Sequence, residues 1–213
     1  MACQFDSRTT EIERNLLRLY QERTEADEAL GTAWYPKAHK LVCEWSDVYG
    51  YSIATVACVI AAISPQCDWE RNLIIADEVL AGYGVSTSGA IRSNVAKAER
   101  IRDDRSHDMR SYFPYGPKVC SFACNLAGDY SVVTVDTHAL QAALANVQAT
   151  YPLKWGPYGG PYAVFAECYA NAAKVVRLEP ATFQAILWHT WKRKYPPSAK
   201  RSKRKQWEVI GEY

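Results

Sequence analysis

The stretch that decides the fold is 113–138, FPYGPKVCSFACNLAGDYSVVTVDTH. Its Pro and Gly residues predict a turn at 114–117, followed by a helix over about 118–126. The β-branched run 132–135 is too short to stand as a lone strand, so we expect an extended connector. That connector leads into a helix over about 137–147.

A side chain with potential for catalysis lies at the start of each of these two helices. Lys118 opens the first helix, and Asp136 stands 18 residues later, directly before the second. A carboxylate can stabilise a developing oxocarbenium ion, and a desolvated lysine amine can attack a sugar C1′. The plain alternatives are that Asp136 caps a helix and that Lys118 is a solvated first-turn residue.

The rest of the chain also predicts helices, separated by turns. Thr10-Glu11-Ile12-Glu13 has the form of a capping box for a helix that ends near Gly31. Helical spacing predicts further helices at 34–49, 52–63, 88–101, 162–176 and 181–194, with a loop at 102–110. Another helix follows Asp68, a candidate cap, and ends at the Gly82-Tyr83-Gly84 turn. In the helix at 181–194, Trp188 and Trp191 follow the spacing of core residues. We expect an all-α protein with one domain over 1–194 and a basic tail over 195–213.

Composition is typical of a globular protein in water, with 48% hydrophobic and 23% charged residues among 213. The longest apolar run, 52–63, is shorter than the about 20 residues that a bilayer span needs, so we expect a buried core helix. The N-terminal segment lacks the apolar stretch of a signal peptide, which favours the cytoplasm.

Positive charge is concentrated near the C-terminus. Eight Lys or Arg and no acid lie between Lys192 and Lys205, whereas the rest of the chain has 17 basic and 23 acidic residues. This asymmetry is typical of nucleic-acid contact, although a solvated tail has the same composition. We therefore expect nonspecific phosphate contacts at 192–194.

The seven cysteines form no C-x-x-C pair and are odd in number, which predicts reduced thiols in helix faces. His138 has no partner at metal-ligand spacing, so no metal site is expected. The aromatic residues Tyr151, Trp155, Tyr158 and Tyr162 predict either core positions or a wall on which a base stacks.

The segment 113–138 resembles the helix-hairpin-helix (HhH-GPD) DNA glycosylases related to endonuclease III. Their hairpin Leu-Pro-Gly-x-Gly-x-Lys and later Val-Asp-Thr-His correspond to Phe-Pro-Tyr-Gly-Pro-Lys, ending at Lys118, and Val135-Asp136-Thr137-His138. The resemblance implies an active-site cleft between two helical halves. It also implies that Lys118 is a Schiff-base amine and Asp136 the activating carboxylate.

Two further segments agree with this resemblance, in family order. Ser64-Pro65-Gln66 is similar to a Ser-x-Gln turn whose Gln fills the space left by a flipped base. The segment 94–101 is similar to the helix before the hairpin. The DNA-binding residues implied by the resemblance, or expected from charge, are Ser64, Gln66, Tyr115, Gly116, His138, Lys192, Arg193 and Lys194.

The chain departs from the family pattern in the hairpin, where Pro114 replaces one glycine and Pro117 removes an N–H donor. The four-cysteine loop of endonuclease III is absent, so no iron–sulfur cluster or other cofactor is expected. The resemblance implies a monomer that acts on double-stranded DNA, excising a modified or mismatched pyrimidine with an AP-lyase step.

Two alternatives stay open. The Gly116-Pro117-Lys118-Val119 and Val133-Thr134-Val135-Asp136 segments also look like phage proteins of this fold. Those proteins are grouped with enzymes proposed to hypermodify thymine or 5-hydroxymethyluracil in phage DNA; such a member would act in the host cytoplasm. The other alternative is a catalytically inactive DNA-binding module, which the altered hairpin favours.

Overall fold

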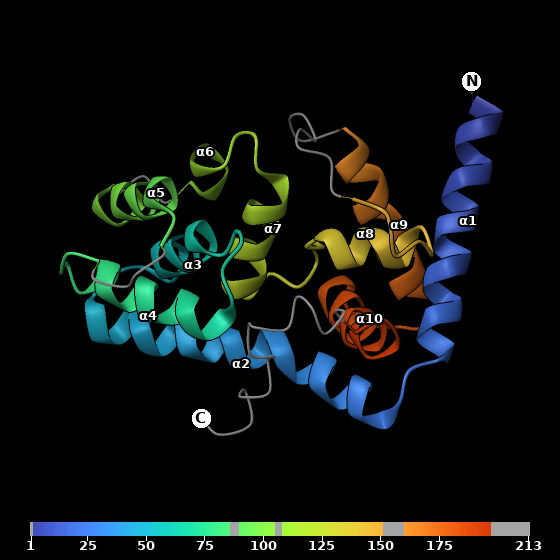
Figure 1. Cartoon of the computed structure of the whole chain (residues 1–213), viewed down its shortest axis with the longest axis horizontal. Helices are drawn as coiled ribbons and strands as arrows, with labels where there is room; N and C mark the ends of the chain where they lie inside the picture. Colours follow the sequence, from blue (N-terminus) through green and yellow to red (C-terminus); the bar gives the residue numbers. More distant parts are fainter. Residues whose placement is uncertain (1, 86–89, 105–107, 151–159, 197–213) are drawn as a thin grey trace. The chain divides into compact units, whose positions relative to one another are not determined.

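A computed structural model of the chain describes residues 2–85, 90–104, 108–150 and 160–196 (Figure 1). The described residues form helices joined by turns and contain no strand, which confirms the all-α prediction. The helices are α1 (Ala2–Gln21), α2 (Glu25–Tyr49), α3 (Ile53–Ile63), α4 (Trp69–Leu80), α5 (Arg92–Asp103), α6 (Met109–Tyr112), α7 (Pro117–Leu126), α8 (Thr137–Ala143), α9 (Pro161–Val175) and α10 (Pro180–Lys194).

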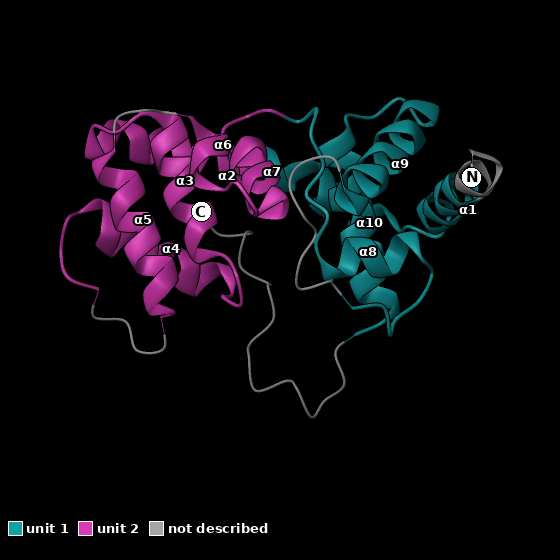
Figure 2. Ribbon diagram, turned by 90° about the horizontal axis from the view of Figure 1, so that it is seen from above, with its two compact units in different colours: residues 1–36, 130–206 teal, residues 37–129, 207–213 magenta. Residues whose placement is uncertain are grey.

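The helices belong to two compact units, coloured separately in Figure 2. The described residues up to Pro36 and from Tyr130 onward form unit 1, which contains α1, α8, α9 and α10. Lys37–Asp129 form unit 2, which contains α3 to α7. Unit 1 is therefore built from both ends of the chain, with unit 2 inserted between them.

Unit 2 is organised around α3, the apolar helix that the sequence predicts. Ser52 caps α3 by accepting a hydrogen bond from the Thr55 N–H, and every residue from Thr55 to Ile63 is buried. α4, α5 and α7 all pack against α3. Asp68 caps α4 as expected, accepting from the Arg71 N–H. The predicted buried core helix is confirmed.

The core of unit 1 lies where α1, α8, α9 and α10 pack together. Leu16, Tyr169, Phe183 and Leu187 are fully buried there. Burying a Leu or Phe side chain stabilises a fold by about 1.5–3 kcal/mol, so each of these residues contributes to the stability of the unit.

The connector before α8 is held by a buried tyrosine. The Tyr162 hydroxyl donates to the Val133 carbonyl (2.8 Å) and accepts from the Val135 N–H (3.1 Å). The segment between these residues is neither helix nor strand, as predicted. Tyr162 is 6% exposed, so it is a core residue and not part of a stacking wall. Tyr151, Trp155 and Tyr158 lie outside the described residues.

The first helix boundary differs from the prediction. Thr24 and Asp27 cap each other's backbone: the Thr24 N–H donates to Asp27 Oδ2 (2.9 Å), and the Asp27 N–H donates to Thr24 Oγ1 (3.2 Å). This reciprocal cap ends α1 at Gln21 and starts α2, which continues through Gly31 and Pro36. The expected helix end near Gly31 is therefore wrong.

Gly31 lies inside α2 because α10 approaches it closely. A Cβ atom on Gly31 would lie 2.5 Å from the Ile186 Cα. Any other residue would collide with backbone there, so glycine is required by packing despite its low helix propensity. This contact fixes the position of α10 within unit 1.

Smaller differences occur elsewhere. α5 extends to Asp103, and α6 is a short helix that begins near the end of the expected 102–110 loop. α8 ends at Ala143, before the predicted end near Val147. The six cysteines whose side chains are described are free thiols, as predicted.

No single helix in the described part of the chain is long and apolar enough to cross a membrane. Only α2 and α3 taken together reach that length and hydropathy, across a bend of 115°.

Candidate active site

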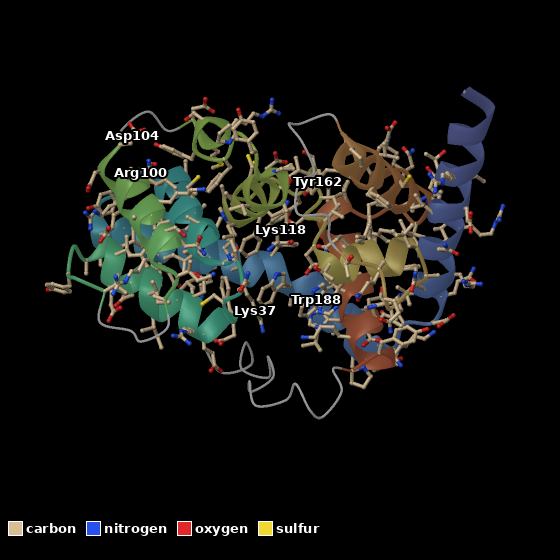
Figure 3. The ribbon with its side chains drawn as sticks, turned by 45° about the horizontal axis from the view of Figure 1, so that its top comes forward. Lys37, Arg100, Asp104, Lys118, Tyr162 and Trp188 are labelled. Atoms are coloured by element: carbon tan, nitrogen blue, oxygen red, sulfur yellow. The ribbon has the colours of Figure 1, made fainter. Side chains whose placement is uncertain are left out.

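The predicted hairpin lies in unit 2, between α6 and α7. The Gly116 N–H donates to the Phe113 carbonyl (3.0 Å), and Gly116 then precedes α7. That N–H is therefore used inside the turn and is not presented to a ligand. Tyr115 is 82% exposed at the turn. Lys118 is half-buried in the first turn of α7 (Figure 3).

The predicted Ser-x-Gln turn also lies in unit 2, at the end of α3. Ser64 Oγ donates to the Ala61 carbonyl (2.8 Å), so its side chain ends the helix. Gln66 is exposed and has a φ of 59°, in the left-handed region that non-glycine residues rarely adopt. A strained, exposed residue of this kind is a candidate for function.

Asp136 lies in unit 1 and caps α8. Its Oδ1 accepts a hydrogen bond from the Ala139 N–H at 2.8 Å. Its Oδ2 accepts one from the indole Nε1–H of Trp188 at 3.0 Å. The capping role that the sequence offered as an alternative is therefore present, together with a contact to α10 that the sequence did not predict.

Several polar side chains of unit 1 contact the ring of Trp188, which Figure 3 labels. Lys192 Nζ lies 4.0 Å from the ring centroid, in a cation–π contact. The His138 ring meets the indole edge-on at 5.9 Å, and the His189 ring does so at 5.1 Å. Asp136, His138 and Lys192, three residues singled out from the sequence, are thus brought together around one indole.

Burial changes the protonation of two side chains in this cluster. Partial burial lowers the pKa of Lys192 to about 8, and the negative charge of Asp136 offsets part of this effect. Burial also lowers the pKa of His189 to about 4, with the positive charge of Lys192 acting in the same direction and Asp27 opposing it. At neutral pH, His189 is uncharged and a measurable share of Lys192 is the free amine.

His138 supplies a further polar atom to the cluster. Its Nδ1 is buried and makes no hydrogen bond with the part of the chain that the structure describes. A buried ring nitrogen without a partner costs stability, about 1–3 kcal/mol. Among the described residues, no three His, Cys, Asp or Glu side chains are grouped so as to hold a metal ion.

The other two predicted phosphate contacts of α10 form ion pairs inside unit 1. Arg193 Nε lies 2.8 Å from Oδ2 of the buried Asp27, and Lys194 pairs with Glu22. Burial alone would raise the pKa of Asp27, but hydrogen bonds from Thr24 and Arg193 bring it below its usual value. These pairs give Arg193 and Lys194 a structural role; contact with DNA stays a prediction. Residues 197–213 lie outside the described part.

Trp188 is the site residue that the sequence analysis missed. Its helical spacing matches that of the core, and the prediction placed it there with Trp191. The structure buries Trp191 but leaves Trp188 partly exposed, with its indole N–H on Asp136. No local pattern links residues 52 positions apart, so this contact had no signal in the sequence.

The fold and the cluster define an all-helical protein whose unit 1 carries a carboxylate, an indole and an amine in contact. Residues 2–195 match the model of a protein family described as a family of unknown function, DUF7178. The match covers most of the chain, so the protein belongs to this family. No curated protein and no solved structure matches the chain.

Proposed function

We propose that the protein acts on a base flipped out of double-stranded DNA. In this proposal it is a glycosylase that cleaves the N-glycosidic bond of a modified or mismatched pyrimidine, with an AP-lyase step. The proposal includes the HhH-GPD fold and an active-site cleft. It rests on the resemblance of 113–138, of Ser64-Pro65-Gln66 and of 94–101 to the helix-hairpin-helix glycosylases.

The observation that carries the proposal is the pair of hydrogen bonds on the carboxylate of Asp136. Its carboxylate accepts two hydrogen bonds, one from the backbone of α8 and one from Trp188. Hydrogen bonds on both oxygens fix the direction in which the carboxylate points. A fixed negative charge is the feature that stabilises positive charge at C1′ as the bond to the base lengthens.

The exposed turn residues of unit 2 supply the expected contacts with DNA. Gln66, in a left-handed conformation at the end of α3, would fill the space left by the flipped base. Tyr115 would contact the duplex from the hairpin, where Pro114, Gly116 and Pro117 leave few backbone N–H groups for a phosphate. Binding then depends more on side chains than in a hairpin with two glycines.

Turnover on a panel of duplexes, each with one modified or mismatched pyrimidine, tests the proposal. Released bases and remaining nucleosides are both measured by mass spectrometry. Asp136→Asn should reduce base release at least about 100-fold, the typical effect of removing an electrostatic contribution. Asparagine is a good helix cap, but its amide nitrogen cannot accept the Trp188 N–H, so a loss of about 1.5–3 kcal/mol in stability should accompany the change and is measured beside turnover. The matched control is Asp68→Asn, which alters the corresponding cap of α4 in unit 2 and should leave turnover unchanged.

The same measurement separates the alternatives. A free base with an abasic product supports the glycosylase. An altered base on an intact backbone indicates a base-modifying enzyme instead, for which 5-hydroxymethyluracil duplexes are the substrate to include. Salt-dependent binding without any product indicates an inactive DNA-binding module.

A further inference from the structure

Lys192 and Asp136 contact the same indole from different directions. Lys192 and Trp188 are one turn apart on α10, so their side chains share a face of the helix. The Lys192 Nζ lies 4.0 Å from the centroid of the Trp188 ring, and the N–H edge of that ring is bonded to Asp136 Oδ2 at 3.0 Å. All three residues belong to unit 1, so their geometry is fixed within one compact body.

The environment of Lys192 differs from that of an ordinary surface lysine. Its side chain is half-buried between solvent and the indole, and burial lowers its pKa to about 8. At pH 7 about 10% of such an amine is unprotonated, roughly 300 times the share for a lysine of ordinary pKa. The unprotonated amine is the form that attacks carbon.

The neighbours of Lys192 include one uncharged ring and one carboxylate. His189 next to Trp188 is uncharged at neutral pH, since burial lowers its pKa to about 4. Asp136 attracts Lys192 but already accepts hydrogen bonds on both oxygens. The cluster therefore combines a positioned carboxylate with an amine of raised reactivity.

We infer that Lys192 is the amine that forms the Schiff base at C1′ of the damaged nucleotide. This inference rests on the proposed function and assigns to Lys192 the role that the family resemblance gives to Lys118. The two lysines lie in different units, and only Lys192 shares a unit with Asp136.

The covalent step is balanced as follows. The lone pair of Nζ bonds to C1′ while the C1′–N bond to the base breaks and its electron pair leaves with the base. Nζ then loses one proton, and the base gains one. Opening of the sugar ring moves a second proton from Nζ to O4′ and leaves a C1′=N imine, which water later hydrolyses back to the amine. Asp136 stabilises the positive charge at C1′ throughout.

Borohydride trapping on a duplex with a single abasic site tests the inference without knowledge of the target base, because an abasic site already presents the C1′ aldehyde. The full-length protein should give a covalent adduct, and peptide mapping should place it on Lys192. Lys192→Gln should reduce the adduct at least about 100-fold. Lys118→Gln should retain it, as should Lys174→Gln, which changes an exposed lysine of the same unit.

Lys192→Arg separates chemistry from folding and from phosphate binding. Arginine keeps a positive charge on the Trp188 ring but cannot form an imine, so the variant should bind abasic DNA with unchanged affinity and give no adduct. The inference is overturned if Lys192→Arg traps as well as the wild type, or if the adduct maps to another lysine.

The remaining outcomes distinguish this inference from the proposed function. An adduct on Lys192 without base release from any duplex in the panel supports Lys192 as the Schiff-base amine and overturns the proposed glycosylase activity. Base release without an adduct overturns the role of Lys192 and supports the proposed glycosylase activity. If neither an adduct nor a released base is found, both the inference and the proposed function are overturned.

Discussion

The indole N–H of Trp188 donates a 3.0 Å hydrogen bond to Oδ2 of Asp136. The bond joins the cap of α8 to the middle of α10. It fixes one carboxylate oxygen while the Ala139 N–H fixes the other. Asp136 is thus held from two elements that are distant in sequence, and this relationship can be tested without removing the carboxylate itself.

Trp188→Phe removes the N–H donor and keeps an aromatic ring under Lys192. Turnover should fall about 10-fold or more, because a hydrogen bond to a charged group is worth about 1.5–3 kcal/mol. The matched control is Trp191→Phe, which removes a similar bond to Gln141 Oε1 (3.3 Å) three residues along the same helix. It should lower stability and not turnover. Equal turnover in both variants would contradict the role assigned to Trp188.

Gln66→Gly tests the wedge role of Gln66. A left-handed conformation costs a non-glycine residue about 1–2 kcal/mol, and glycine relieves it while adding about 0.5–1 kcal/mol of chain entropy on folding. Stability should therefore stay nearly unchanged, and a loss of base flipping, measured by 2-aminopurine fluorescence, is attributable to the side chain. Arg177, exposed with the same φ of 59°, provides the control Arg177→Gly. Unchanged flipping in Gln66→Gly would count against the wedge.

Acid should destabilise unit 1 through His189. The folded-state pKa is about 4 against an ordinary value of 6.5, because burial and the charge of Lys192 disfavour the imidazolium, with Asp27 acting the other way. Between these values the unfolded chain binds a proton that the folded protein does not, so stability falls as pH drops from about 6.5 towards about 4. Urea unfolding at pH 7 and pH 5 measures this. His189→Gln should lose less stability over that interval, and an identical loss would rule the residue out.

Gly31→Ala should destabilise the protein although alanine is the better helix former. The gain in helix propensity is about 1 kcal/mol, whereas overpacking typically costs about 1–3 kcal/mol. Here the Cβ would lie 2.5 Å from Ile186 backbone atoms, which cannot move aside as a flexible side chain can. The loss should therefore exceed the gain in a urea titration. A more stable variant would mean that α10 adjusts its position freely.

The sequence predicts most of the helices because their signals are local. Asp68 is a good cap directly before an apolar periodic segment, and it caps the helix expected of it. Ser52, expected as the first residue of its helix, is the cap of α3. The boundary between α1 and α2 was missed because the cap formed by Thr24 with Asp27 was not recognised; the expected capping box at Thr10–Glu13 lies inside α1. The continuation of α2 through Gly31 depends on its contact with Ile186, which is a tertiary effect.

The candidate site was only partly predictable for the same reason. Asp136 was found because its place before a helix is a local feature. Lys192 was expected from composition to contact phosphate, yet its side chain packs on Trp188 within α10. From sequence alone, a polar face of a helix that is exposed to solvent cannot be distinguished from a polar face that contacts another element, because both consist of polar residues.

Because the described residues of unit 2 lie in the sequence between the two segments of unit 1, the ribosome completes them before it completes unit 1. Once a ribosome has released Asp129, every helix of unit 2 is available to fold, whereas α1 still lacks α9 and α10, the helices against which it packs. Domains fold as units while the chain emerges, so Leu16 and Leu19 stay without their native cover until the last helix arrives. The hydrogen bond between Trp188 and Asp136 also forms only after α10 has been synthesised. A nascent chain that stalls before α10 would therefore expose apolar surface and carry no assembled site.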